Sequence, residues 1–520
     1  MTQPDRLFRA ALILVEVTDD GTPQTLADAG LLVRDGRVIR AGAFADIARD
    51  APEAEVIGDG TEIILPGFVN AHHHVGLTPL QLGSPDMPLE LWFATRLVCR
   101  AVDLHLDTLY GAFDMIASGV TTVQHLHGWL PGDLSEAHAG AAQVLRAYDE
   151  VGMRASYSVA TRDQCRLVYG DDAAFLATLP ADIAAALRRH FDRFRLTLAE
   201  QRELFLSLHA AYASHDRIRV QLAPANLHWC SDAALDQVAD LSERTGAPMH
   251  MHLLETAYQR AYADRRAPGR SAVEKIADHG LLTPRMTLGH GVWLEEADID
   301  RVAASGAAIC HNCSSNLRLR SGIAPLNTWA ARGVPVAMGL DEAGLNDDRD
   351  MLQEIRLALR LHRVPGHDPG DVPTIPQILR AATQGGARTT PFAGRIGTLG
   401  EGMAADLVML DAGAIASPFL APETGLLEAA ALRARREHVR RVAVAGEVIY
   451  ENGRFTRVDR DAAMAALHAS MARARDAGEV ERKWLAEHLL PHVRRFYDGW
   501  IAPGTFGPSY AATRRLPHEW

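Results

Sequence analysis

The sequence predicts an α/β protein, a (β/α)8 TIM barrel with a small split β-sandwich domain. Three observations support this prediction. The chain has 520 residues, enough for one barrel of roughly 250 residues with accessory parts, and 48% of them are hydrophobic. Through its middle, short apolar stretches alternate with amphipathic ones, the pattern of strands followed by helices. Short β-rich segments lie at both ends of that region.

The β-rich ends share a hairpin pattern. Residues 29–41 alternate around Asp35-Gly36, and residues 442–455 alternate around Ala445-Gly446. Two such segments can pair into one domain, with the barrel inserted between them. The predicted boundaries are a composite β-sandwich domain over 1–64 and 396–456, a barrel over 65–395, and a helical C-terminal extension over 457–520.

Eight apolar stretches are the expected barrel strands. They cover residues 63–70, 120–125, 153–160, 218–223, 248–252, 286–290, 307–311 and 334–339. Helices are expected between them, for example over 235–245 and 271–279, and again from 458 to 497. The segment 501–520 contains Pro and Gly, and we interpret it as a surface extension or as a tail that wraps a neighbouring subunit.

Composition narrows the function. The formal net charge is -12 and the pI is about 6.0, which argues against a nucleic-acid-binding protein. No signal peptide and no run of ~20 apolar residues is present, so no membrane partner is expected. The five cysteines are scattered apart from Cys310 and Cys313, which flank His-Asn at a predicted strand end, and all are expected to be reduced thiols in a cytoplasm. We expect a cytoplasmic enzyme with a small-molecule substrate.

Metal-type ligands follow several predicted strands. The first strand ends in three histidines, and alternate residues of an extended chain face one way. His72 and His74 therefore point inward together, while His73 points away. Strands five, six and eight end near His252, His290 and Asp341. Imidazole and carboxylate ligands suit zinc or ferrous iron, and the bound ion would lower the pKa of a water towards ~7.

The stretch LPGFVNAHHH (65–74) resembles the metal-binding start of amidohydrolase-superfamily barrels. Further motifs follow in the order of the branch that contains atrazine chlorohydrolase and aminoheterocycle deaminases. They are HMHLLET (250–256), TLGHGVWL (287–294), HNCSSNLRLRSGIAP (311–325), GLDEAGLNDDRDMLQE (339–354), ATQGGAR (382–388) and IGTLGEGMAADLVMLD (396–411). The similarity covers residues 31–455 and is specific for the branch, not for a substrate.

The resemblance implies a role for each matching residue. One divalent ion, zinc first and iron second, would be held by His72, His74, His252 and Asp341. Glu255 would move protons between water and leaving group. His290 would hold the attacking water or the substrate oxygen, and Asp341 would also accept a proton from the water.

The lysines argue for one ion. Related branches hold two metals bridged by a carboxylated lysine. The two lysines of this chain, Lys275 and Lys483, fall in a predicted helix and in the C-terminal extension. Neither lies at a strand end, so the sequence predicts a single metal.

Some candidate substrate contacts stand where the sequence departs from the branch pattern, and others are further pocket candidates. The full set is Trp92, His125, His127, Gln164, Asn226, His228 and Asn316. Trp92 could cap the site, but packing is the favoured interpretation, and Asn316 lies in a run that is also ordinary loop chemistry. His125 and His127 are loop histidines, substrate contacts or ligands of a second ion. Asn226 and His228 stand where the branch often has a His-containing substrate motif.

The predicted activity is hydrolysis of a C–N bond at an sp2 carbon, in the first place deamination of an aminoheterocycle or cyclic amidine. Cleavage of an amide, urea or carbamate by the same metal site is the alternative. A non-catalytic barrel that binds a partner is a third hypothesis, and it ranks lower because all five metal and proton-shuttle positions are filled. Branch members often form dimers, so a homo-oligomer is expected by analogy.

Overall fold

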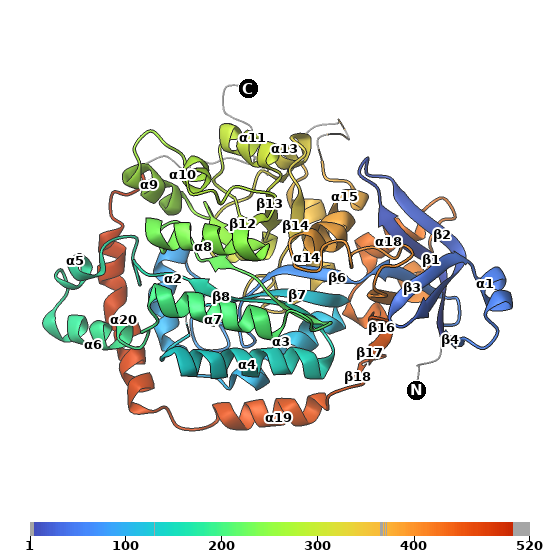
Figure 1. Ribbon diagram of the computed structural model, residues 1–520, viewed down its shortest axis with the longest axis horizontal. Coiled ribbons are helices and arrows are strands. Elements are labelled where there is room, and N and C mark those ends of the chain that lie inside the picture. Colours follow the sequence, from blue (N-terminus) through green and yellow to red (C-terminus); the bar gives the residue numbers. More distant parts are fainter. Residues whose placement is uncertain (1–4, 129, 365–367, 369, 371, 503–520) are drawn as a thin grey trace.

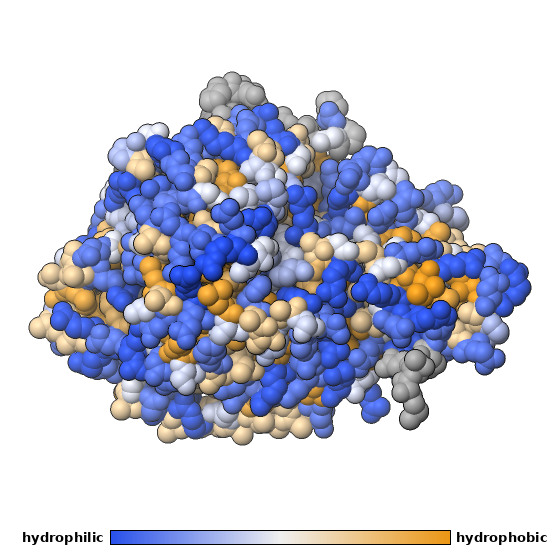
Figure 2. All heavy atoms as spheres, in the orientation of Figure 1, coloured by the Kyte–Doolittle hydropathy of each residue, from blue (hydrophilic) through white to orange (hydrophobic). Residues whose placement is uncertain are grey.

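The computed structural model describes residues 5–128, 130–364, 368, 370 and 372–502 (Figure 1). A barrel occupies the centre and left of this view, and the N-terminal strands form a sheet at the right. Figure 2 shows hydrophilic side chains over most of the visible face, with hydrophobic residues in small patches. In the described part of the chain, no helix combines the length and hydrophobicity needed to cross a membrane.

Parallel strands form the barrel. They are β6 (Phe68–His73), β7 (Val120–His127), β8 (Arg154–Thr161), β9 (Ile218–Val220), β10 (Ala223–Pro224), β11 (Met249–Leu253), β12 (Met286–His290), β13 (Ala308–His311) and β14 (Val336–Met338). They run in two sheets, β10-β8-β7-β6 with β9 beside β8, and β11-β12-β13-β14. Single bridges join the sheets, Leu222 to Met249 on one side and His73 to Asp341 on the other. The barrel is therefore closed, and the predicted (β/α)8 fold is confirmed.

Two predicted strands have different bounds. The fourth, 218–223, is divided into β9 and β10. The first, 63–70, is two strands, because the chain leaves the sheet after β5 (Glu62–Pro66) and enters the barrel at β6. Gly67 is the crossing point. Its N–H donates to the carbonyl of Asp406, and a Cβ there would lie 2.3 Å from the side chain of Thr121. Only glycine fits that approach.

Helices surround the barrel. They are α2 (Leu89–Thr95), α3 (Leu104–Ala117), α4 (Leu134–Val151), α5 (Asp172–Leu176), α6 (Ala181–Phe191), α7 (Leu198–Ala211), α8 (Asp232–Thr245), α9 (Ala257–Arg266), α10 (Ala272–Asp278), α11 (Glu296–Ser305), α12 (Cys313–Arg318), α13 (Leu326–Ala331), α14 (Met351–Leu361) and α15 (Ile375–Arg380). Local sequence sets their ends. Asp133 and Glu136 form a capping box at the start of α4, and Gly152 ends that helix at φ +83°.

The β-rich ends of the chain pair into one nine-stranded sheet of order β18-β17-β16-β15-β5-β1-β2-β3, with β4 beside β1. Its strands are β1 (Arg6–Val17), β2 (Pro23–Arg34), β3 (Arg37–Ala43), β4 (Glu55–Ile57), β5, β15 (Leu407–Asp411), β16 (Val439–Val444), β17 (Glu447–Glu451) and β18 (Arg454–Phe455). The two segments meet where β15 runs antiparallel to β5. The division of the chain into domains at the predicted residues stays a prediction.

The C-terminal helices α19 (Arg460–Met471) and α20 (Ala477–Phe496) follow. Helix α20 runs along the left edge in Figure 1 and packs against α2 and α6. Its apolar face, with Leu485, Leu489 and Val493, is fully buried in a cluster that includes Leu97 and Leu187. The interpretation of segment 501–520 concerns residues that, from 503 onward, lie outside the described part of the chain.

Candidate metal centre

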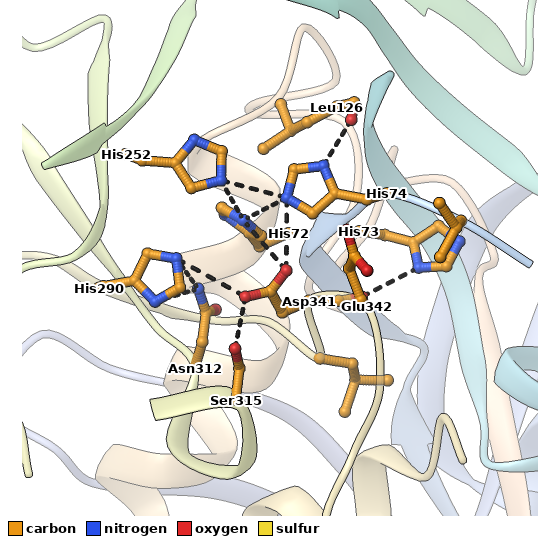
Figure 3. Close-up of polar contacts among 12 residues, drawn as sticks. His72, His73, His74, Leu126, His252, His290, Asn312, Ser315, Asp341 and Glu342 are labelled. Carbon is orange, nitrogen blue, oxygen red and sulfur yellow. Dashed lines mark hydrogen bonds and ion pairs between the residues drawn. The ribbon is translucent and has the colours of Figure 1, made fainter. Parts of the chain in front are cut away.

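Three imidazole nitrogens meet at the C-terminal end of the barrel (Figure 3). Nε2 of His72 lies 3.0 Å from Nε2 of His74 and 3.1 Å from Nε2 of His252, and the latter two are 3.1 Å apart. His72 is in β6, His74 directly follows that strand, and His252 is in β11. His73 faces the other side of the strand, where its Nδ1 lies 3.3 Å from the carbonyl oxygen of Asp341.

Backbone carbonyls fix the protons of two of these rings. Nδ1 of His74 lies 2.6 Å from the carbonyl oxygen of Leu126, and Nδ1 of His252 lies 2.9 Å from that of Ala225. A carbonyl oxygen only accepts hydrogen bonds, so each ring carries its proton on Nδ1. The Nε2 atoms of both rings are then bare lone pairs that point at the same place.

This arrangement fits a cation. Two bare nitrogens 3.1 Å apart repel each other, and the Nε2 of His72 can donate a proton to only one of them. A divalent ion placed between the lone pairs removes the conflict, and nitrogen with carboxylate oxygen is a ligand set that zinc prefers. Nδ1 of His72 also has an outer partner, Nε2 of His250 at 2.8 Å, which leaves its Nε2 free to bind an ion.

Asp341 completes the donor set. Its Oδ1 lies 3.3 Å from Nε2 of His74, and Ser315 donates a hydrogen bond of 2.6 Å to its Oδ2. Burial alone would raise the pKa of Asp341, but His74 and His290 bring it down to about 2, so the group is a carboxylate at neutral pH. Its backbone has φ +55°, a region that costs a non-glycine residue roughly 1–3 kcal/mol. Tertiary contacts therefore hold this residue in place.

Glu255 and His290 face the same point. Nε2 of His290 lies 3.8 Å from Oε2 of Glu255 and 3.7 Å from Oδ2 of Asp341. Burial raises the pKa of Glu255 well above its ordinary value, and the charges of Asp341 and Glu90 raise it further. The buried surroundings of Glu255 therefore favour its protonated form. Nδ1 of His290 lies 2.9 Å from Oδ1 of Asn316, so its proton sits there and Nε2 faces the carboxyl groups.

These groups border a cavity of about 330 Å³, at the lower end of the ~300–1,000 Å³ of small-molecule sites. Aromatic side chains form part of its wall. Phe93 and Trp229 meet edge to face with ring centroids 5.2 Å apart, and Trp92 lies beside Phe93. Trp92 also packs on Leu319, as expected of a packing residue, and its contact with substrate stays a prediction. Of the predicted substrate contacts, Trp92 and Asn226 line the cavity.

The structure places His125 and His127 behind the wall. Nδ1 of His125 lies 2.8 Å from the hydroxyl of Tyr148, and its ring meets His73 edge to face. Nδ1 of His127 lies 3.0 Å from the hydroxyl of Tyr157. Both rings are engaged with neighbouring strands and helices, and neither lines this cavity, so direct substrate contact by these residues stays a prediction.

Gln164, His228 and Asn316 are likewise absent from the cavity lining. The amide of Gln164 donates to the carbonyls of His228 and Cys230 and thereby ties two loops together. His228 is buried under Tyr169, with ring centroids 3.9 Å apart. Asn316 holds His290 instead of touching the cavity. Their role as direct contacts likewise stays a prediction.

Sequence reasoning missed other wall residues. Arg96 forms an ion pair with Glu342 and lies over the ring of Trp92. Arg193 follows α6, and Arg482 comes from α20. The order of motifs gave no signal for Arg193 or Arg482, because both lie in segments without a motif. For His250, the H-M-H spacing was a usable signal, since its ring lies beside His72.

The model of the amidohydrolase family matches residues 63–449. An enzyme of Nitratidesulfovibrio vulgaris named 5-methylthioadenosine/S-adenosylhomocysteine deaminase is 31% identical over 499 residues, which cover 94% of this chain and all of that protein. A protein named 5'-deoxyadenosine deaminase from Methanothermobacter thermautotrophicus is 29% identical and covers 75% of this chain and 84% of its own length.

Solved structures share the fold. An adenosine deaminase from Xanthomonas campestris with bound zinc superposes with a TM-score of 0.75 at 24% identity, covering 90% of this chain and 98% of that one. An atrazine chlorohydrolase from Arthrobacter aurescens in complex with zinc gives 0.77 at 20% identity, with 89% and 99% covered. Both are under 25% identical, so they bear on the fold alone.

Proposed function

The chain belongs to the amidohydrolase family, and from this premise we propose that it is a metal-dependent deaminase of an aminoheterocycle. It is a hydrolase that acts on C–N bonds. The observation that carries the finer proposal is the convergence of bare Nε2 atoms on one point, beside the buried carboxyl group of Glu255. Deamination at an sp2 carbon needs both a place for a cation and a proton for the leaving nitrogen.

His72, His74, His252 and Asp341 would hold one divalent ion, zinc first and iron second. When bound, such an ion lowers the pKa of a coordinated water towards ~7 and so supplies hydroxide at neutral pH. The set of imidazole nitrogens and one carboxylate supports zinc as the ion. The count of one ion per chain is part of the proposal.

The remaining steps belong to side chains. Asp341, a carboxylate fixed by Ser315, takes the proton that the attacking water releases. The water oxygen bonds to the ring carbon that carries the amino group. Glu255 donates its proton to that nitrogen, the C–N bond breaks, and ammonia leaves while the ring keeps the oxygen. Nε2 of His290, held between Glu255 and Asp341, positions the oxygen that becomes the carbonyl.

The proposed substrate is an adenosine-type nucleoside with a modified 5' position. The names of two relatives describe deaminases of such compounds. The aromatic wall of Trp92, Phe93 and Trp229 supports this proposal, because flat heterocycles stack on aromatic rings. A cytoplasmic location and a dimeric state stay predictions.

The test is ammonia release from a panel of compounds by zinc-loaded protein. The panel contains adenosine, 5'-methylthioadenosine, S-adenosylhomocysteine, guanine, an aryl amide, a urea and a carbamate. We expect ammonia from the adenosine compounds, together with the ultraviolet change that accompanies loss of the ring amino group. Release of an amine from the amide, urea or carbamate instead would support the alternative activity. No turnover of any compound by loaded protein would contradict the proposal.

A further inference from the structure

Three basic residues lie close together in the wall of the metal-centre cavity. His190 and Arg193 come from the end of α6 and the residues after it, and Arg482 comes from α20. The chain as a whole carries a formal net charge of -12, so clustered cations here are not a general property of the molecule. Arg482 also lies outside the residues matched by the family model, which end at 449.

The guanidinium groups of Arg193 and Arg482 have no carboxylate within ion-pair distance among the described residues 5–128, 130–364, 368, 370 and 372–502. The acidic side chains nearby are already engaged. Glu481 pairs with Arg189 at 2.5 Å, and Asp476 accepts from the backbone of Glu479 at 2.7 Å. Both arginines are half-buried, a position in which a charge without an ion-pair partner is costly. The more distant charge of Asp476 offsets only part of this cost for Arg193.

The cations also act on one another. Burial lowers the pKa of Arg193, and the neighbouring charge of Arg482 lowers it further. Burial, Arg193 and Arg482 together lower the pKa of His190 to about 3, so His190 is neutral and the two arginines carry the charge. Repulsion between two like charges on one wall is relieved when an anion binds between them.

The backbone segments that carry the two arginines are anchored to the rest of the protein. Helix α20 is anchored by the buried Leu485 and Leu489, and by Glu479, whose carboxylate accepts from the backbone N–H of Ala101 at 3.1 Å. The carbonyl of Arg193 accepts a hydrogen bond of 2.7 Å from the N–H of Gly132. Planar guanidinium groups on a fixed support suit the two oxygens of a carboxylate or phosphate.

We propose that Arg193 and Arg482 form a subsite for an anionic substituent of the substrate, a carboxylate or a phosphate, in the wall of this cavity. This inference rests on the proposed function and names the substrate class more closely. The same cavity is lined by His74 and Asp341, so one molecule can reach both the arginines and the metal centre. Arginine is over-represented where such groups are recognised.

The test compares matched substrates on zinc-loaded enzyme. The pairs are adenosine with adenosine monophosphate, and 5'-methylthioadenosine with S-adenosylhomocysteine, which carries a carboxylate. We expect kcat/KM to favour the charged member, and we expect that preference to fall about tenfold in Arg193→Gln and in Arg482→Gln, mainly through KM. Arg495→Gln, an exposed arginine on the same helix, is the control that keeps the wild-type preference. The pair with the larger preference identifies phosphate or carboxylate as the natural group.

Direct binding separates this inference from the activity. Calorimetric titration with inorganic phosphate and with acetate is run on the wild type, on the double variant of Arg193 and Arg482, and on Arg495→Gln, after thermal unfolding shows that all three are folded. Weaker anion binding in the double variant alone supports the subsite even if no compound is deaminated. Equal binding in all three, or equal substrate preference in all variants, overturns the subsite and leaves the deaminase proposal standing.

Discussion

The hydroxyl of Ser315 donates a hydrogen bond of 2.6 Å to Oδ2 of Asp341 and so orients the carboxylate that faces three imidazoles. Ser315→Ala removes this bond without removing a proposed ligand. We expect kcat/KM to fall about tenfold, because a hydrogen bond to a charged group contributes about 1.5–3 kcal/mol. Metal content should stay at the wild-type level. Ser305→Ala, whose hydroxyl bonds a helix carbonyl, is the matched control. Unchanged kinetics in Ser315→Ala would show that Asp341 needs no such support.

Measurement of metal content tests whether the proposed histidine and aspartate ligands bind an ion. Protein purified without chelator should contain about one zinc or iron per chain, and His252→Ala and Asp341→Ala should contain much less. His468→Ala, an exposed histidine of α19, should retain the metal. A measured content of two would contradict the single-ion proposal and direct attention to the buried group of His311, Cys313 and His362. No metal, with none taken up on addition, would contradict the metal mechanism itself.

Glu255 is the proposed proton donor. Glu255→Gln keeps the size of the side chain and removes the transferable proton, so kcat should fall by about 10²–10⁴. Metal content and thermal stability should stay near wild type, because Glu255 is not a proposed ligand. Glu487→Gln, exposed on α20, should leave kcat unchanged. Retention of most of the activity in Glu255→Gln would assign proton transfer to another group.

Acid should destabilise helix α20, which contributes Arg482 to the cavity wall. Chiefly through its hydrogen bond to Arg473, the pKa of Glu479 is lowered from its ordinary value of 4.5 to about 2. A carboxylate with a lowered folded-state pKa stabilises the fold above its unfolded value and loses that contribution as pH falls. Protection of residues 477–496 from hydrogen exchange should therefore decrease between about pH 4.5 and 2. In Glu479→Gln that part of the pH dependence should be missing. The same pH dependence in both proteins would exclude Glu479 as its source.

The crossing from sheet to barrel depends on Gly67. A Cβ there would lie 2.3 Å from the side chain of Thr121, so Gly67→Ala should lower the free energy of unfolding by about 1–3 kcal/mol. Urea denaturation measures this directly. Gly425→Ala is the control, because its added Cβ would meet nothing within 4 Å. An equal effect of the two substitutions would show that contact with Thr121 is relieved by a small shift.

The sequence predicted what short-range patterns encode. Alternation in β6 predicts that His72 and His74 share one face and that His73 takes the other, and these rings lie that way in the structure. Hairpin residues around Asp35-Gly36 predict the turn between β2 and β3. Such features depend on the backbone geometry of a few consecutive residues. The sequence of those residues is therefore enough to predict them.

Tertiary structure decided the rest. The carbonyls of Leu126 and Ala225 fix the protons of His74 and His252 across separations of 52 and 27 residues. His125 lies near the end of strand β7, where a contact with the site was expected, but its ring lies behind the cavity wall and contacts Tyr148. Arg482, from the last described helix, reaches the cavity only because α20 folds back over α2 and α6. Contacts between distant segments have no local pattern, since packing of the whole chain determines them.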